Sequence, residues 1–225
     1  MQQNAAIVPL NGKRADGTNG HHLEISSEAD MPTLDQNINE EVKIEMISRH
    51  FRQIMLILGL NLNDDSLKDT PYRVARMYVR ETFSGLNPEN KPSISLFENS
   101  YCYNEMLLEK NITLYSCCEH HFVPIIGKAH VAYYSSGKVI GLSKINRVVQ
   151  YYSRRPQVQE RLTVAIADAL KSILCTEDVA VMIDAVHLCV SSRGVQDVNS
   201  TTITSHYSGK FKIPEVKNEF LSYLK

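Results

Sequence analysis

The chain has 225 residues, a formal charge of −1 at pH 7 and a hydrophobic share of 43%. This length suits one medium domain with an extension, and the near-zero charge gives no electrostatic reason to expect a nucleic-acid partner. No apolar run approaches the ~20 residues that span a bilayer, and no secretory signal is visible at the N-terminus. The five cysteines form an odd set, which argues against a complete disulfide framework. We therefore expect a cytoplasmic protein with reduced thiols and no membrane contact.

Residues 1–40 are rich in Asn, Gly, Asp, Glu and Ser and contain few aromatic residues. Such a segment buries too little apolar surface to order itself, so the composition predicts a disordered N-terminal tail. His21 and His22 lie in this segment. We expect solvated side chains there rather than a metal site.

Residues 41–100 are predicted to form an N-terminal helical unit. Residues 40–60 carry apolar side chains at helical spacing, and Gly59 is the predicted C-cap. A second helix is expected over 69–86, because Thr70 suits an N-cap and Pro71 suits the first helical position.

Residues 101–225 are predicted to form an α+β domain. Its β-branched and aromatic runs predict strands, and its segments with helical spacing predict two main helices and a short closing one. Ser143 is the predicted N-cap of the first main helix. An antiparallel sheet with two helices packed on one face follows from this order. The expected strands are 111–116, 127–142, 179–194 and 200–211, and the expected helices are 143–155, 158–174 and 212–224.

The stretch YSCCEHHFVPIIG at 115–127 contains the first candidate metal ligands. Cys118 and His121 have ligand spacing, although one such pair is a weak signal. His187 and Cys189 are two residues apart on a predicted strand, so they are expected to share one face, with Val190 on the opposite face. A buried histidine beside a small apolar cysteine is the simpler explanation of that strand alone.

Together, Cys118, His121 and Cys189 offer two thiolates and one imidazole, a set that favours zinc. Three protein ligands leave an open coordination position, the pattern of catalytic zinc, which lowers the pKa of a bound water to ~7. His120 and His187 would then be neighbours suited to proton transfer. Two alternatives stay open: a closed structural site with Cys117 or His187 as fourth ligand, and a strained Cys117–Cys118 redox pair.

Several basic residues near predicted helix starts are candidates for phosphate binding. Lys144 and Arg147 follow Ser143 at a predicted helix N-terminus. Arg193 follows the strand that carries His187 and Cys189, and Arg73 follows Thr70 near another helix start. For each residue alone, a solvated surface charge is the simpler explanation.

Glu160 lies in the first predicted turn of 158–174. A carboxylate there favours the helix dipole, and it also suits the adjacent N–H donors of a guanine edge.

Long stretches of the chain resemble GTP cyclohydrolase I. They are CEHHFVPIIGKAHVAYY, GLSKINRVVQYYSRRPQVQERLT, DAVHLCVSSRGVQ, TPYRVARMYV and ETFSGL, and the resemblance extends from about residue 40 to the C-terminus. It implies the tunnelling fold (T-fold), in which five subunits join their sheets into a ring and two rings stack into a homodecamer. It also implies hydrolytic opening of the guanine ring of GTP at C8, giving 7,8-dihydroneopterin triphosphate and formate, the first step of folate or tetrahydrobiopterin synthesis.

The resemblance carries site roles to individual positions. One zinc ion per subunit is expected on Cys118, His121 and Cys189, and the catalytic histidines are expected to be His120 and His187. The expected partners are GTP and further copies of the chain, with a regulatory protein as an additional candidate. A zinc nucleobase deaminase is a weaker alternative, because H-x-E and P-C-x-x-C are missing, and a non-catalytic zinc-stabilised module is the third. The substrate-binding residues implied are Glu160, Gln159, Ser143, Lys144, Arg147, Arg193 and Arg73.

Overall fold

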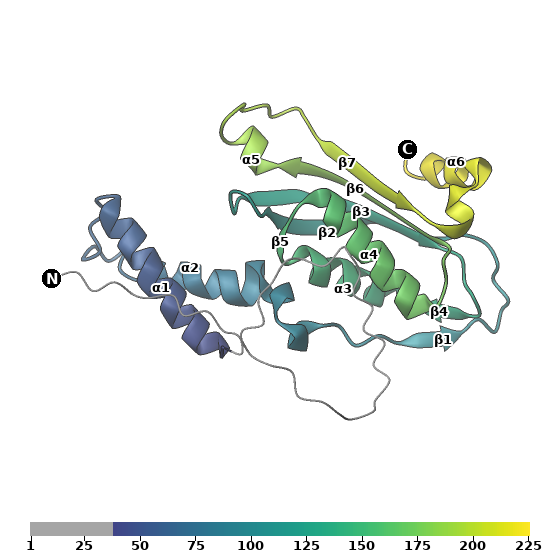
Figure 1. Ribbon diagram of the computed structural model, residues 1–225, viewed down its shortest axis with the longest axis horizontal. Coiled ribbons are helices and arrows are strands. Elements are labelled where there is room, and N and C mark those ends of the chain that lie inside the picture. The colour runs from purple at the N-terminus through teal and green to yellow at the C-terminus, as the bar shows by residue number, and fades with distance from the viewer. Residues whose placement is uncertain (1–37) are drawn as a thin grey trace, which may run out of the picture.

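The computed structural model describes residues 38–225, in which a curled sheet carries two long helices on one face (Figure 1). The sheet has five strands in the order β5-β2-β3-β6-β7. All its pairings are antiparallel except that of β5 with β2, so the α+β prediction is confirmed with a mixed sheet. Its strands are β2 (Leu107–Cys118), β3 (Pro124–Tyr133), β5 (Pro156–Gln157), β6 (Val179–His187) and β7 (Thr202–Tyr207), and the helices are α3 (Leu142–Ser153) and α4 (Gln159–Leu174).

The predicted tail lies almost wholly outside the described residues, and so do His21 and His22. The first described helix, α1, begins near the expected position. The N-terminal unit comprises α1 (Glu40–Ile57), α2 (Thr70–Met77), a π-helical turn η1 (Tyr78–Thr82) and the 3₁₀ turns η2 (Ser84–Leu86) and η3 (Pro88–Asn90).

The second N-terminal helix is shorter than predicted. Its N-cap is Asp69, so the prediction that Thr70 is the cap is wrong by one residue. Farther along, Gly85 docks on the C-terminal end of α3, where its N–H donates to the carbonyl oxygen of Arg154 at 2.9 Å. A side chain at Gly85 would lie 2.1 Å from the carbonyl oxygen of Tyr151, so only glycine permits this approach.

The predicted strand 127–142 is two strands. β3 ends at Tyr133, the chain turns through Gly137, whose φ is +109°, and β4 (Lys138–Ile140) pairs instead with β1 (Leu96–Glu98). The next helix, α3, has Gly141 as its N-cap, so the prediction that Ser143 is the cap is also wrong. Ser143 lies inside the first turn of the helix.

The predicted strand 179–194 also ends early. Its pairing with β3 stops at His187, and the next residues form the helical turn α5 (Leu188–Ser191), with Ser192 N–H bonded to the carbonyl oxygen of Leu188 at 2.9 Å. Cys189 is therefore on a helical turn, and the expectation that it shares a strand face with His187 is wrong. Val190, expected to face a core, is 38% exposed.

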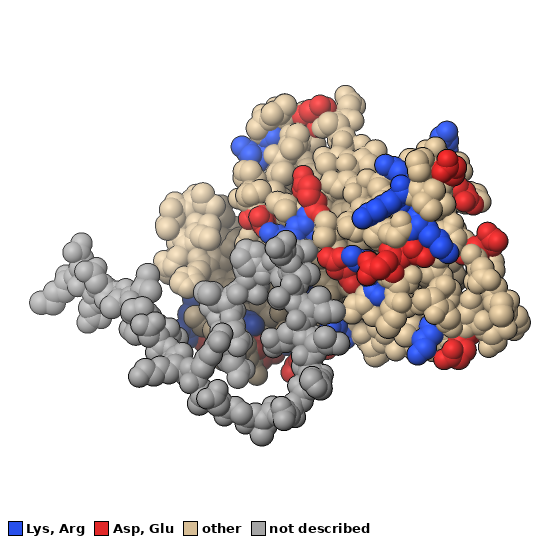
Figure 2. All heavy atoms as spheres, turned by 45° about the vertical axis from the view of Figure 1, so that its right-hand side comes forward, with Lys and Arg blue, Asp and Glu red and all other residues tan. Residues whose placement is uncertain are grey.

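The surface carries charges of both signs. Figure 2 shows Lys and Arg side chains interspersed with Asp and Glu over the viewed face. Within residues 38–225, no helix is both long and apolar enough to cross a membrane. The remaining elements follow β7 in the chain: a 3₁₀ turn η4 (Gly209–Lys212) and the helix α6 (Pro214–Ser222).

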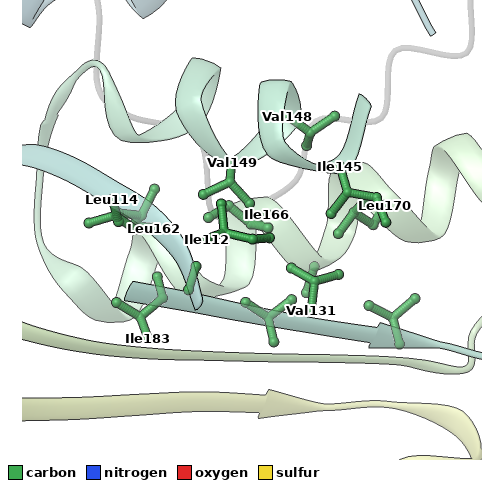
Figure 3. Packing of buried hydrophobic residues seen from close by; sticks show 14 of the residues in the cluster. Ile112, Leu114, Val131, Ile145, Val148, Val149, Leu162, Ile166, Leu170 and Ile183 are labelled. Carbon is green, nitrogen blue, oxygen red and sulfur yellow. The ribbon is translucent and has the colours of Figure 1, made fainter. Parts of the chain in front are cut away.

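The main core lies between the sheet and the two long helices (Figure 3). Val149 and Ile166 come from the helices, Val131 and Ile183 from the strands, and all four are fully buried. Burying such a side chain stabilises the fold by roughly 1.5–3 kcal/mol. A smaller cluster around Phe211 and the α6 side chain Phe220 packs against Ala132 on the other face.

Burial lowers the pKa of three histidines below the ordinary value of 6.5: His130, His187 and His206. The folded state then keeps them neutral while the unfolded chain binds protons, so stability is full above about pH 6.5 and falls as pH drops through the folded-state pKa values. We expect the free energy of unfolding, measured in urea, to decrease between pH 7.5 and pH 5.5. His130→Gln should flatten this dependence and His50→Gln, at an exposed site, should not; an unchanged slope in His130→Gln would contradict the assignment.

Candidate metal centre and active site

Three predicted ligands converge at one end of the sheet. Cys118 ends β2, His121 lies in the turn that follows, and Cys189 lies on α5. Their ligand atoms all lie within 4.8 Å of one another, and Cys118 Sγ is 4.0 Å from His121 Nδ1. Among residues 38–225 they are the one group of three or more such side chains placed this closely.

Strand pairing explains how residues so far apart in sequence meet. β3 pairs with β2 on one side and with β6 on the other, so that Cys117 lies opposite Pro124 and His187 lies opposite Ile125. The turn between β2 and β3 is closed by the Phe122 N–H, which donates to the carbonyl oxygen of Cys118 at 2.8 Å. The two predicted pairs, Cys118 with His121 and His187 with Cys189, therefore reach the same end of the sheet.

The donor set fits zinc. Four ligands at the usual zinc–sulfur and zinc–nitrogen distances lie about 3.5–3.8 Å apart, close to the spacing found here. Burial, followed by the neighbouring Cys118, raises the pKa of the Cys189 thiol. The Cys189 thiol therefore resists ionising without a cation, and a divalent metal removes that cost.

Neither candidate for a fourth protein ligand joins this group. Cys117 is buried, and its thiol lies outside the group of ligand atoms. His187 also lies outside the group, and its Nε2 contacts the side chain of Gln159. The arrangement therefore favours the three-ligand, open site over the closed one.

His187 is held by Gln159, the first residue of α4. The two side chains meet at 2.7 Å between His187 Nε2 and Gln159 Oε1. Gln159 is 1% exposed, and its amide nitrogen lies near two carbonyl oxygens, 3.2 Å from Ile183 and 2.8 Å from Thr202. Since carbonyls only accept, the amide oxygen must face His187, which donates from Nε2 and leaves Nδ1 unprotonated when neutral.

The hydrogen bond between Gln159 and His187 bears on the prediction that Gln159 binds the substrate. Its side chain orients His187 and has no free donor toward solvent. Direct substrate binding by Gln159 stays a prediction that these contacts do not favour.

The other residues predicted for the metal end do lie near it. His120 Nδ1 is 3.8 Å from Cys118 Sγ, and Arg193 Nη1 is 3.1 Å from His121 Nε2. Glu160 is exposed in the first turn of α4, and its charge opposes the lowering of the His187 pKa.

The predicted phosphate residues on α3 lie at the opposite end of the sheet. Ile140, just before that helix, donates its N–H to Tyr133 Oη at 3.3 Å, and Tyr133 is the last residue of β3. The metal group lies beside the first residue of β3. Ten residues at ~3.3 Å each make about 30 Å, so the start of α3 lies about that length of strand from the metal group of its own chain.

Arg73 is separate from both groups. It lies on α2 with its side chain 66% exposed, 3.7 Å from Asp69 Oδ2. No contact joins it to the other predicted substrate-binding residues in the described part of the chain.

The sequence profile of GTP cyclohydrolase I matches residues 47–225. A protein described as GTP cyclohydrolase 1 from Flavobacterium johnsoniae is 60% identical over 189 residues, covering 84% of this chain and 85% of its own. Proteins of the same description from Aeromonas salmonicida and Yersinia enterocolitica are 52% and 50% identical, over 86% and 89% of this chain and 89% and 92% of theirs.

The chain belongs to the GTP cyclohydrolase I family.

Membership confirms the predicted activity: the protein is an enzyme with GTP cyclohydrolase I activity, which forms dihydroneopterin triphosphate in pterin synthesis. The Cys118, His121 and Cys189 group is consistent with the zinc site of a GTP cyclohydrolase I.

Two features of the site were not found from the sequence. Phe122 has a left-handed backbone, with φ +52°, and its ring packs edge-on against Tyr78 and Phe83 at 6.3 and 5.1 Å. The N-terminal helical unit is thus anchored on the turn between β2 and β3, which carries His121. The second feature is an ion pair between Glu119 and Arg161. No local pattern marks either contact, because each joins segments remote in sequence.

Proposed function

We propose that the enzyme opens the guanine imidazole ring of GTP at the metal end, where Cys118, His121 and Cys189 hold one zinc ion per subunit. The convergence of these ligands with the oriented imidazole of His187 is the observation that carries this proposal. Zinc in an open three-ligand site supplies Lewis acidity and activates water at neutral pH. That chemistry suits hydrolysis at C8 and the release of formate.

We propose that His187 and His120 transfer the protons of this reaction. The Nδ1 atom of His187 is free to accept a proton, because Nε2 is committed to Gln159. Burial lowers the pKa of His187, which keeps a neutral base available at pH 7. His120 is exposed beside Cys118 and can reach a ligand at the metal end.

Glu160 is proposed to bind the guanine edge. Its carboxylate has no hydrogen bond to other described residues and lies at the start of α4, directly after Gln159. An exposed, unpaired carboxylate can accept from N1–H and the 2-amino group together, a pair of donors that guanine offers and adenine lacks.

We propose that the triphosphate is bound by Ser143, Lys144 and Arg147 of a neighbouring subunit, together with Arg193 at the metal end. The start of α3 offers free N–H groups, and its first two turns carry the cationic side chains. About 30 Å of β3 separates them from the metal group of their own chain, and a nucleotide triphosphate is much shorter. Arg73 is proposed to join this site through subunit contact.

The sheet leaves two edges for such an assembly. Over residues 38–225, β5 pairs only with Cys117 and Cys118, so the rest of β2 has no partner on that side, and β7 is the opposite edge. Long unpaired edges invite pairing with another chain. This supports a closed ring, which we propose to be the homodecamer of two stacked pentamers.

A mixed-oligomer experiment tests the shared site. Cys189→Ala and Lys144→Ala are each expected to be nearly inactive, one through the metal end and one through the phosphate end. Coexpressed at equal levels they should recover about a quarter of wild-type activity, because half of the metal ends and half of the phosphate ends are intact.

Cys118→Ala coexpressed with Cys189→Ala is the control, since both disable the same end and should not complement. If the first pair is no more active than the separate variants, both ends belong to one chain and the proposal fails.

The proposed domains are the tail (1–40), the helical unit (41–100) and the catalytic domain (101–225). The pairing of β1 with β4 crosses the second boundary, so the unit and the domain pack together. We propose a cytoplasmic location, where Cys118 and Cys189 stay reduced and able to bind metal. A regulatory protein partner stays a prediction.

The direct test of function is to incubate the purified enzyme with GTP and zinc, and to follow dihydropterin absorbance and formate. Both products should appear in equal amounts. GTP binding without either product would support a non-catalytic module, and ammonia release would support a deaminase.

A further inference from the structure

Glu119 lies between metal ligands in sequence but is not part of the metal group. Its carboxylate instead binds the guanidinium of Arg161 on α4. We propose that Glu119, held by Arg161, is a positioning residue for His120, an inference that rests on the proposed catalytic role of that histidine.

The carboxylate is anchored firmly. Arg161 Nε donates to Gln157 Oε1 at 3.1 Å, while its Nη2 donates to Glu119 Oε2. The Glu119 main-chain N–H donates to the carbonyl oxygen of Gln157, also at 3.1 Å. The side chains of Arg161 and Glu119 are only 17% and 27% exposed, so the pair is partly shielded from solvent and salt. Both the backbone and the side chain of Glu119 are thus fixed to the segment that starts α4.

The place of Arg161 in its helix is otherwise unfavourable. It is the third residue of α4, where the helix dipole favours anions and opposes cations. Helix stability therefore does not explain an arginine here. The contact of Arg161 with Glu119 does explain it, because the carboxylate offsets the unfavourable interaction of the guanidinium with the helix dipole.

The second oxygen of that carboxylate faces His120. Glu119 Oε1 lies 3.8 Å from His120 Nε2, and His120 Nδ1 lies 3.8 Å from Cys118 Sγ. Within residues 38–225, these are the polar neighbours of the two ring nitrogens. The imidazole is 65% exposed, so packing does not fix it, and a small rotation brings Nε2–H into a hydrogen bond with the carboxylate.

The consequence is a defined tautomer. With the proton on Nε2 held by Glu119, the neutral ring presents unprotonated Nδ1 toward the metal end. His187 reaches the same state by a different partner, the amide of Gln159. His187 is then oriented by Gln159 in the first turn of α4. His120 is oriented by Glu119, which is itself bound by Arg161 in the same turn.

Glu119→Gln tests this positioning, because it keeps the shape and removes the charge. We expect kcat to fall about 10–100-fold, with KM for GTP and bound zinc per subunit unchanged. Arg161→Lys should reduce kcat less, since lysine keeps the charge but loses the fork that holds both partners. Asp168→Asn is the matched control: Asp168 is also 27% exposed and paired with an α4 cation, Lys171, and its loss should not change kcat.

A double-mutant cycle with His120→Ala separates the possible failures. Glu119→Gln should have no further effect on kcat when His120 is absent. If His120→Ala alone keeps full kcat, the proposed role of that histidine fails. If His120→Ala slows the reaction but Glu119→Gln does not, or if the two effects multiply, or if Glu119→Gln loses zinc, the positioning role is overturned.

Discussion

Cys189→Ala is expected to lose bound zinc and activity together. Removing one of three protein ligands leaves a thiolate and an imidazole, too few to hold an open zinc site, and we expect kcat/KM to fall by about 10³-fold or more. Metal content per subunit and formate release would be measured on the same preparation.

Cys117→Ala is the matched control. Cys117 directly precedes the ligand Cys118 and is buried, but its thiol stays outside the ligand group. It should keep one zinc per subunit and most of its activity. A Cys189→Ala enzyme that worked at full rate without zinc would refute the metal assignment, and zinc loss in Cys117→Ala would favour the closed site.

Glu160→Ala is expected to raise KM for GTP about 100-fold while leaving zinc content unchanged. A charge-assisted pair of hydrogen bonds to the guanine edge is lost, and the donors of the base are left unpaired. Comparing GTP with ITP, which lacks the 2-amino group, sharpens the test. The wild-type enzyme should prefer GTP, and the variant should treat the two alike.

Glu215→Ala controls for the helix dipole. Glu215 is likewise an exposed acidic residue in the first turn of a helix, α6, and lies outside the proposed site. It should leave KM for both nucleotides unchanged. If the Glu160→Ala enzyme kept the wild-type preference for GTP over ITP, the proposal that Glu160 binds the guanine edge would be wrong.

Local signals predicted most elements but not where they end. The helical spacing of 158–174 was confirmed as α4 almost to the residue, because a long amphipathic helix packs on the sheet through that same pattern. The caps at Thr70 and Ser143 were wrong, since Asp69 and Gly141 take those positions. Capping depends on the path of the preceding chain, which β-pairing and docking decide.

Cys189 joins the predicted metal group, although the geometric reason for expecting it there was wrong. The i, i+2 argument placed it on a strand, whereas β6 ends at His187, opposite the beginning of its antiparallel neighbour β3. A one-turn helix then directs the thiol to the same side as Cys118. Sequence spacing restricts which residues can meet, but the end of a strand is set by its partner.

The sequence by itself determined the family, the α+β pattern and the three residues of the metal group, because these depend on residue types in long specific stretches. Only the tertiary structure decided that the start of α3 and the metal group of one chain lie at opposite ends of β3, a strand about 30 Å long. It likewise decided which nitrogen of His187 is free and which cation holds Glu119. Such contacts join residues remote in sequence, and strand register and helix packing alone bring them together.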